Sequence, residues 1–130
     1  MKKIEEKEIV GISALLIHAA KIDEMYSEGE KEIILHFIEA NMMEGSSSGK
    51  ILKKAEELET NANQLLEFTK IIKDSSKEIK NEIIEKLWKI LISDKKVDQY
   101  ESNLMRRICG LIYFSDKMSA EIKLKIINSK

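Results

Sequence analysis

Proline is absent from the 130 residues of this chain. Proline interrupts helices, because it lacks a backbone N–H and its ring clashes with the preceding turn. The chain is instead rich in lysine, glutamate, isoleucine and leucine, with 43% hydrophobic and 35% charged residues, a composition typical of amphipathic helices. We therefore expect an all-α protein, and the length fits a single domain over residues 1–130 that buries its core without disulfides.

An excess of charge of one sign is also missing. The 22 basic side chains are balanced by 23 acidic ones, which gives a formal net charge of -1. No overall field would attract this protein to nucleic acid or to an anionic membrane. Arg106 and Arg107 could bind an acidic partner, but adjacent arginines on a helix usually place one of the two on a solvated side. We expect no nucleic acid among the partners.

Cysteine is nearly absent, since Cys109 is the only one. It lies in the apolar run 108–112, which predicts a small buried residue in a reducing compartment. A catalytic thiol needs a basic partner, and neither His18 nor His36 is close to it in sequence. Phosphate-binding loops, nucleophile elbows and zinc-ligand spacings are missing as well. We therefore expect no enzymatic activity.

No apolar stretch reaches the roughly 20 residues that a membrane-spanning helix requires. The start of the chain imitates a secretory signal, because two lysines precede the apolar run 9–17. However, Glu5, Glu6 and Glu8 put acidic side chains where a signal peptide carries basic ones, and no cleavage site follows cleanly. The sequence predicts a soluble, cytoplasmic protein without an integral membrane segment.

Apolar residues recur at steps of three and four along most of the chain, which predicts six to seven helices in a compact bundle. The first helix spans about 4–22, and 42–49 is predicted to be a flexible loop because glycine and serine fill it. The pattern over 51–72 fits two helices or one that is kinked near Asn61 and Asn63. Asp74, Ser75 and Ser76 are expected to form the start signal of a helix, and further helices are expected to follow Asp98 and Ser119. Trp88 is expected to be a core residue.

The most informative feature is an internal repeat. A shift of 71 residues, the separation of Asp23 and Asp94, matches apolar residues with apolar ones and polar residues with polar ones. The matched pairs are Leu16 and Leu87, Ala20 and Leu91, Asp23 and Asp94, Ser27 and Asp98, Glu30 and Glu101, Ile33 and Leu104, and Phe37 and Ile108. The repeat predicts two pseudo-symmetric helix-loop-helix halves.

Each half joins its helices by an acidic loop, Asp-x-x-apolar-(Ser/Asp)-x-x-Glu. Ser27 and Glu30 have the spacing of a capping box, and so do Asp98 and Glu101, so helix capping explains half of the pattern.

The aspartates need a different explanation. Asp23 and Asp94 come at the ends of helices, where the macrodipole disfavours a carboxylate. Either Asx-turns compensate for this, or the loops meet and Asp23, Glu30, Asp94 and Glu101 bind one cation. Their oxygen atoms suit Ca²⁺, Mg²⁺ or Mn²⁺.

Two related metal sites can be excluded. The pattern resembles the end of an EF-hand loop, but loop positions 1 and 3 fall on Ile90 and Ile92 in the second copy, which cannot bind calcium through their side chains. A di-iron bundle requires Glu-x-x-His motifs, and neither histidine follows a glutamate at that spacing. His18 is expected to be a partly buried helix residue.

Three segments resemble the TerB-like family, known for tellurite resistance and stress-response systems. They are 19–30 with the first acidic loop, 55–69, and 87–116 with Leu87-Trp88 and Tyr113-Phe114. The resemblance implies a compact all-α fold of two pseudo-symmetric units, and a metal site at Asp23, Glu30, Asp94 and Glu101.

Our leading hypothesis is a non-enzymatic module that binds a divalent cation or a partner protein around the acidic loops, as a monomer or homodimer. The alternatives are a helical adaptor or dimerisation scaffold without metal, and a hydrolase that activates water on a metal.

Overall fold

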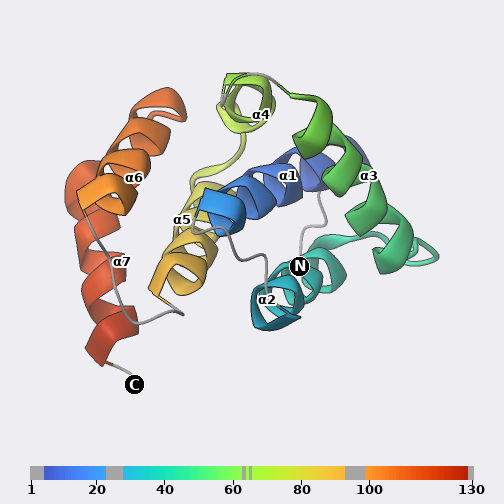
Figure 1. Ribbon diagram of the computed structural model, residues 1–130, viewed down its shortest axis with the longest axis horizontal. Coiled ribbons are helices and arrows are strands. Elements are labelled where there is room, and N and C mark those ends of the chain that lie inside the picture. The colour runs from blue at the N-terminus through green and yellow to red at the C-terminus, as the bar shows by residue number, and fades with distance from the viewer. Residues whose placement is uncertain (1–4, 23–27, 63, 65, 93–98, 129–130) are drawn as a thin grey trace.

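The computed structural model describes residues 5–22, 28–62, 64, 66–92 and 99–128. The helices within these residues are α1 (Glu6–Ile22), α2 (Glu28–Asn41), α3 (Ser48–Asn61), α4 (Leu66–Ile72), α5 (Lys77–Ile92), α6 (Gln99–Leu111) and α7 (Asp116–Asn128). The described part of the chain contains no strand, so the predicted all-α bundle is confirmed. Figure 1 shows α1 in the middle of the molecule, with α3 towards one end and α6 and α7 at the other.

Helix α1 is buried on all sides along most of its length. The sequence predicts one apolar stripe, yet every residue from 11 to 17 is buried. The reason is that α2, α3, α4 and α5 all pack against this helix, and a helix enclosed by neighbours must be apolar around its whole circumference. Gly11 lies at a close contact with α4, because a methyl group added there would come within 3.0 Å of the Ile71 side chain.

The structure also follows the internal repeat. The shift of 71 residues sends Glu6 to Lys77, so the first residue of α1 matches the first residue of α5. Apolar pairs related by the shift have the same degree of burial: Leu16 and Leu87 as well as Phe37 and Ile108 are fully buried, and Ile33 and Leu104 are half-buried. Residues related by the shift therefore occupy equivalent packing positions in the core.

Serine caps define several helix starts. The hydroxyl of Ser76 accepts a hydrogen bond of 3.2 Å from the Ile79 backbone N–H, which confirms the predicted start of α5. Ser47 caps α3 in the same way. The predicted loop over 42–49 is therefore too long, because Ser48 and Gly49 already belong to α3. The serines that resemble a flexible loop include a helix cap and the first helical residue.

Two further boundaries differ from or refine the prediction. Helix α7 begins at Asp116 rather than after Ser119, because the hydroxyl of Ser115 accepts a 3.3 Å hydrogen bond from the Met118 backbone and caps the helix. The pattern over 51–72 forms two helices, α3 and α4, and α3 ends at Asn61. Asn63 lies outside the described residues.

Trp88 is a core residue, as expected, and it joins α5 to α7. Its ring is 4% exposed, and its indole N–H donates a hydrogen bond of 3.0 Å to the hydroxyl of Ser119 on α7. The Lys123 ammonium group lies 5.0 Å from the ring centroid, within the range of a cation–π interaction. Cys109 of α6 also bonds to Ser119, so this one serine connects α5, α6 and α7.

Helix α6 ends in a Schellman motif that uses a tyrosine in place of glycine. The backbone N–H of Phe114 donates a 2.8 Å hydrogen bond to the carbonyl of Cys109, which is the six-to-one bond of this motif. Tyr113 has a φ of 61°, and its side chain is 76% exposed. A side chain other than glycine is strained in this left-handed conformation, so Tyr113 costs stability without contributing to the core.

Within the described residues, no helix combines the length and the hydropathy needed to cross a membrane.

The contact of Gly11 predicts opposite effects for two alanine substitutions. Gly11→Ala should lower the free energy of unfolding by about 1–3 kcal/mol, because Ile71 and its helix must shift. Gly110→Ala, on the exposed side of α6 with nothing within 4 Å, should raise it by up to about 1 kcal/mol through helix propensity. Urea denaturation checks both, and a Gly11→Ala protein as stable as the parent chain would contradict the packing.

The strain at Tyr113 predicts that Tyr113→Gly raises the free energy of unfolding by about 1 kcal/mol. Urea denaturation of Tyr113→Gly and Tyr113→Ala separates the effect of the positive φ on stability from the effect of the tyrosine ring. Alanine keeps the positive φ, so it should bring no comparable gain. Equal gains from both variants would show that the ring, and not φ, is the source of the strain.

Candidate functional site

The structure describes one of the four predicted cation ligands in full. Glu30 lies in the first turn of α2, and its side chain is 5% exposed. Glu101 belongs to α6, but its side chain lies outside the described residues, as do Asp23 and Asp94. Among the side chains that are described, no group of three or more His, Cys, Asp or Glu could hold a metal ion.

Three of the four helices that border the predicted site are in contact with one another, whereas the main contacts of the fourth, α6, are with α4 and α7. Helix α1 precedes the first acidic loop and α5 precedes the second, and these two helices pack together. Helix α2, which follows the first loop, packs against both. Glu30 is buried at the N-terminal end of α2, where the positive end of the macrodipole favours a carboxylate.

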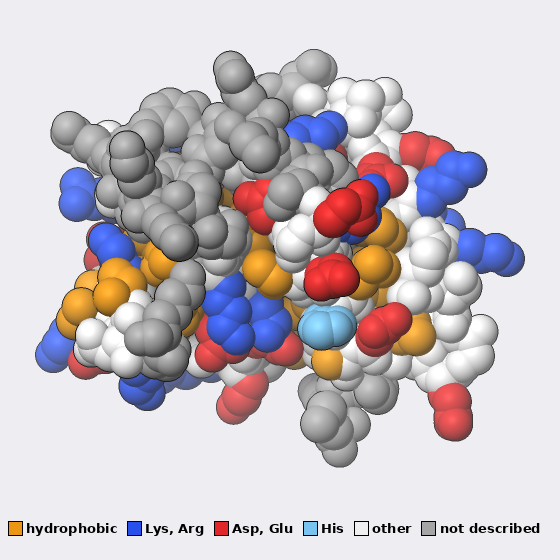
Figure 2. Space-filling model, turned by 60° about the horizontal axis from the view of Figure 1, so that its bottom comes forward, with side chains coloured by type: hydrophobic (Ala, Val, Ile, Leu, Met, Phe, Trp, Pro, Cys, Tyr) orange, Lys and Arg blue, Asp and Glu red, His pale blue; other side chains and the backbone are white. Residues whose placement is uncertain are grey.

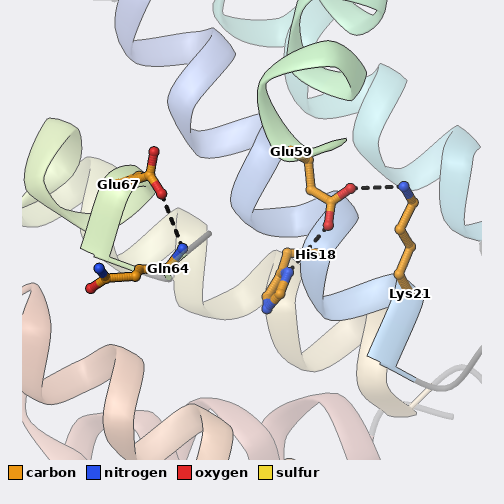
Figure 3. Close-up of polar contacts among 5 residues, drawn as sticks. All are labelled: His18, Lys21, Glu59, Gln64 and Glu67. Atoms are coloured by element: carbon orange, nitrogen blue, oxygen red, sulfur yellow. Dashed lines mark hydrogen bonds and ion pairs between the residues drawn. The ribbon is translucent and has the colours of Figure 1, made fainter. Parts of the chain in front are cut away.

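A polar cluster that the sequence did not predict joins the last turns of α1 and α3 (Figure 3). One oxygen of Glu59 accepts a 2.7 Å hydrogen bond from the Lys21 ammonium group, and the other lies 3.2 Å from Nδ1 of His18. The Glu59 side chain is 10% exposed, while Lys21 and His18 are 43% and 38% exposed. A nearly buried carboxylate thus has a partner on each oxygen.

Two effects act on the Glu59 carboxyl group in opposite directions. Burial raises its pKa, but the hydrogen bonds from Lys21 and His18, together with their charges, outweigh burial and leave the pKa below its ordinary value. Glu59 therefore stays ionised and ties the end of α1 to the end of α3. The positive charge of Lys21, two residues before Asp23, is therefore neutralised by the Glu59 carboxylate.

His18 does not form a nucleophile–base pair with any described side chain. Its polar contact is with Glu59, and its ring lies 5.9 Å from that of Phe68, centroid to centroid, at a tilt of 48°. The expectation of a partly buried helix residue is confirmed. No local sequence signal could have revealed the cluster, because His18 and Glu59 are 41 residues apart.

Cys109 is 1% exposed, as expected for a core residue. Burial raises the pKa of its thiol and the charge of Asp116 acts in the same direction, whereas the hydrogen bond with Ser119 lowers it by less. The thiol is therefore protonated at neutral pH and is a poor nucleophile.

The exposed side of α2 is acidic. Glu28, Glu32 and Glu39 are all exposed, together with His36, and their spacing places them on one side of the helix. Figure 2 shows acidic side chains around a histidine on this face of the molecule. Helix α2 has no basic residue in its last turn. The segment that follows the first acidic loop thus carries a negative surface.

A family model described as tellurite resistance protein TerB matches residues 10–124, nearly the whole chain. No curated protein and no solved structure matches the chain significantly.

The lowered pKa of Glu59 predicts a pH-dependent contribution to stability. A carboxyl group with a lowered pKa stabilises the fold fully above its unfolded-state value of about 4.3, and that contribution is lost as the pH falls through the folded-state pKa. At pH 7, Glu59→Gln should lower the free energy of unfolding by about 1–2 kcal/mol. The difference from the parent chain should shrink between about pH 5 and pH 3.

Glu57→Gln is the matched control, because Glu57 is exposed on the same helix. Urea denaturation at several pH values should show a change within about 0.5 kcal/mol for this variant. If Glu59→Gln differs from the parent chain by the same amount at pH 3 and pH 7, the ionised carboxylate does not tie α1 to α3.

Proposed function

The chain belongs to the TerB family of tellurite resistance proteins, and from this we propose that it is a non-enzymatic binding module whose two acidic loops together hold a divalent cation. The ligands would be Asp23 and Glu30 from the first loop and Asp94 and Glu101 from the second. TerB is not a known enzyme family. A place in a cytoplasmic stress response, with a partner protein that binds the loaded loops, is part of the same proposal.

The burial of Glu30 is the main observation that supports the proposal. A carboxylate with 5% exposure is expensive to bury unless positive charge or hydrogen-bond donors compensate. The N-terminal end of α2 supplies part of this compensation. Glu30 also has an interaction of its own within the chain, and a cation bound at the loop would hold the neighbouring carboxylates together against their mutual repulsion.

The repeat supports a site made by both loops. Glu30 and Glu101 occupy the same position in their halves, and the helices before the loops, α1 and α5, pack against each other. Two equivalent loops on paired helices can contribute equivalent ligands to one ion.

The chemistry of the donors favours a hard cation. All four proposed side chains bind through carboxylate oxygens, the ligands preferred by Ca²⁺, Mg²⁺ and Mn²⁺. Glu28 and Glu32 add negative charge close by on the exposed side of α2, which raises the local concentration of cations. Lys21 does not oppose this, because Glu59 binds its ammonium group.

The alternative is a helical adaptor or dimerisation scaffold in which the acidic residues only cap helices. Such a protein would show no response to metal.

Thermal unfolding with millimolar Ca²⁺, Mg²⁺ or Mn²⁺ tests the proposal. A cation at ten times its Kd should add roughly 1.4 kcal/mol to the free energy of unfolding, and chelation should reverse the gain. The stabilisation should vanish in Asp23→Asn and in Asp94→Asn, because each removes a charged ligand from a different loop.

Asp74→Asn is the control for charge, since Asp74 is exposed in the turn before α5 and should leave the response to metal intact. The scaffold would be favoured instead if no cation raised the melting temperature of the parent chain, or if all three variants responded equally.

A further inference from the structure

A second surface, built from other residues than the acidic loops, has the features of a peptide-binding groove. It is a cavity of about 370 Å³ between the first turns of α5 and the turn that joins α6 to α7. Its lining residues are Lys77, Lys80, Tyr113, Phe114, Ser115 and Met118. We propose that this groove docks a short acidic segment of a partner protein, with one apolar side chain of that segment seated in the cavity. The proposal does not depend on cation binding.

The charge of the groove selects the occupant. Both charged residues of its lining are lysines, and within the described residues neither Lys77 nor Lys80 forms an ion pair, unlike Lys21, Lys54 and Lys89. Glu78 and Asp116 are close in sequence but do not line the groove. Two free ammonium groups on one rim are complementary to carboxylates.

The lysines are also badly placed for the stability of α5. Lys77 is its first residue, and Lys80 follows one turn later, so both lie near the positive end of the macrodipole, where a cation is unfavourable. The first turn of α7, with Ser115 and Met118, lies on the same groove and adds a second positive helix end. All of these groups favour an anion.

Tyr113 gives the second independent indication. Its backbone is strained at a φ of 61°, and its ring is 76% exposed, so the fold gains little from having tyrosine at a position suited to glycine. Residues that destabilise the fold are expected at positions where a function requires them. Tyrosine is enriched among the residues that dominate protein interfaces.

The apolar residues of the lining indicate that the bound segment carries an apolar side chain as well as negative charge. Phe114 forms a largely buried floor, and the half-buried Met118 has a flexible thioether side chain that can adapt to a partner. The cavity has the volume for an apolar side chain. A segment in which acidic residues flank a leucine or phenylalanine therefore fits best.

An NMR titration of the full chain tests the proposal. The probe is a short synthetic peptide with a central leucine flanked by aspartates, and amide shifts should concentrate at 77–80 and 113–118. A peptide of aspartate alone should bind several-fold more weakly. The double variant Lys77→Glu/Lys80→Glu should lower the affinity at least about tenfold, because it reverses both charges.

Lys50→Glu/Lys53→Glu is the matched control. These lysines are exposed near the start of α3 with the same spacing, so this variant makes the same change in net charge and should bind like the parent chain. Tyr113→Gly should weaken binding while leaving the fold at least as stable, which keeps the test valid if the charge reversal impairs folding.

Other results would overturn the proposal. They are peptide shifts outside the groove, equal weakening by both double variants, or no binding. Binding of phosphatidylserine vesicles but not of the peptide, lost on reversal of Lys77 and Lys80, would make the surface a membrane contact. Shifts that appear at 77–80 and 113–118 on concentrating the chain without peptide would make it a contact between two copies.

Discussion

The burial of α1 is the constraint on which the rest of the structure depends. Four helices pack against it, so it tolerates neither a polar stripe nor added volume, as the close approach of Ile71 to Gly11 shows. Because the hydrophobic effect scales with the apolar area removed from water, an enclosed helix contributes more per residue than one at the surface. Helix α1 is thus the central packing element of the described residues.

Periodicity and the repeat predicted the architecture, because both are local or regular signals. The start of α5 after Ser76 and the paired burial of Phe37 and Ile108 could be read directly from spacing. The start of α7 could not, because Ser115 and Ser119 are both plausible caps and only tertiary packing shows that Ser119 bonds to Trp88.

The candidate site was less predictable than the fold. The sequence indicated Glu30 as an acidic residue at a helix start, and its low exposure adds to that indication. It could not indicate Glu59, which has no unusual local sequence and acquires its role only when α3 packs against α1. Nor could it indicate the strain at Tyr113, because no glycine marks the position at which α6 ends.

The bond from Lys21 to Glu59 makes the two halves mechanically unequal. The end of α1 is tied across to α3, whereas Lys86 and Lys89 near the end of α5 pair with Glu85 of their own helix. A duplicated sequence thus holds the end of one helix by an ion pair to a neighbouring helix, and the end of its counterpart by the core hydrogen bond from Trp88 to Ser119 of α7, so the two halves differ in how strongly salt and pH act on them.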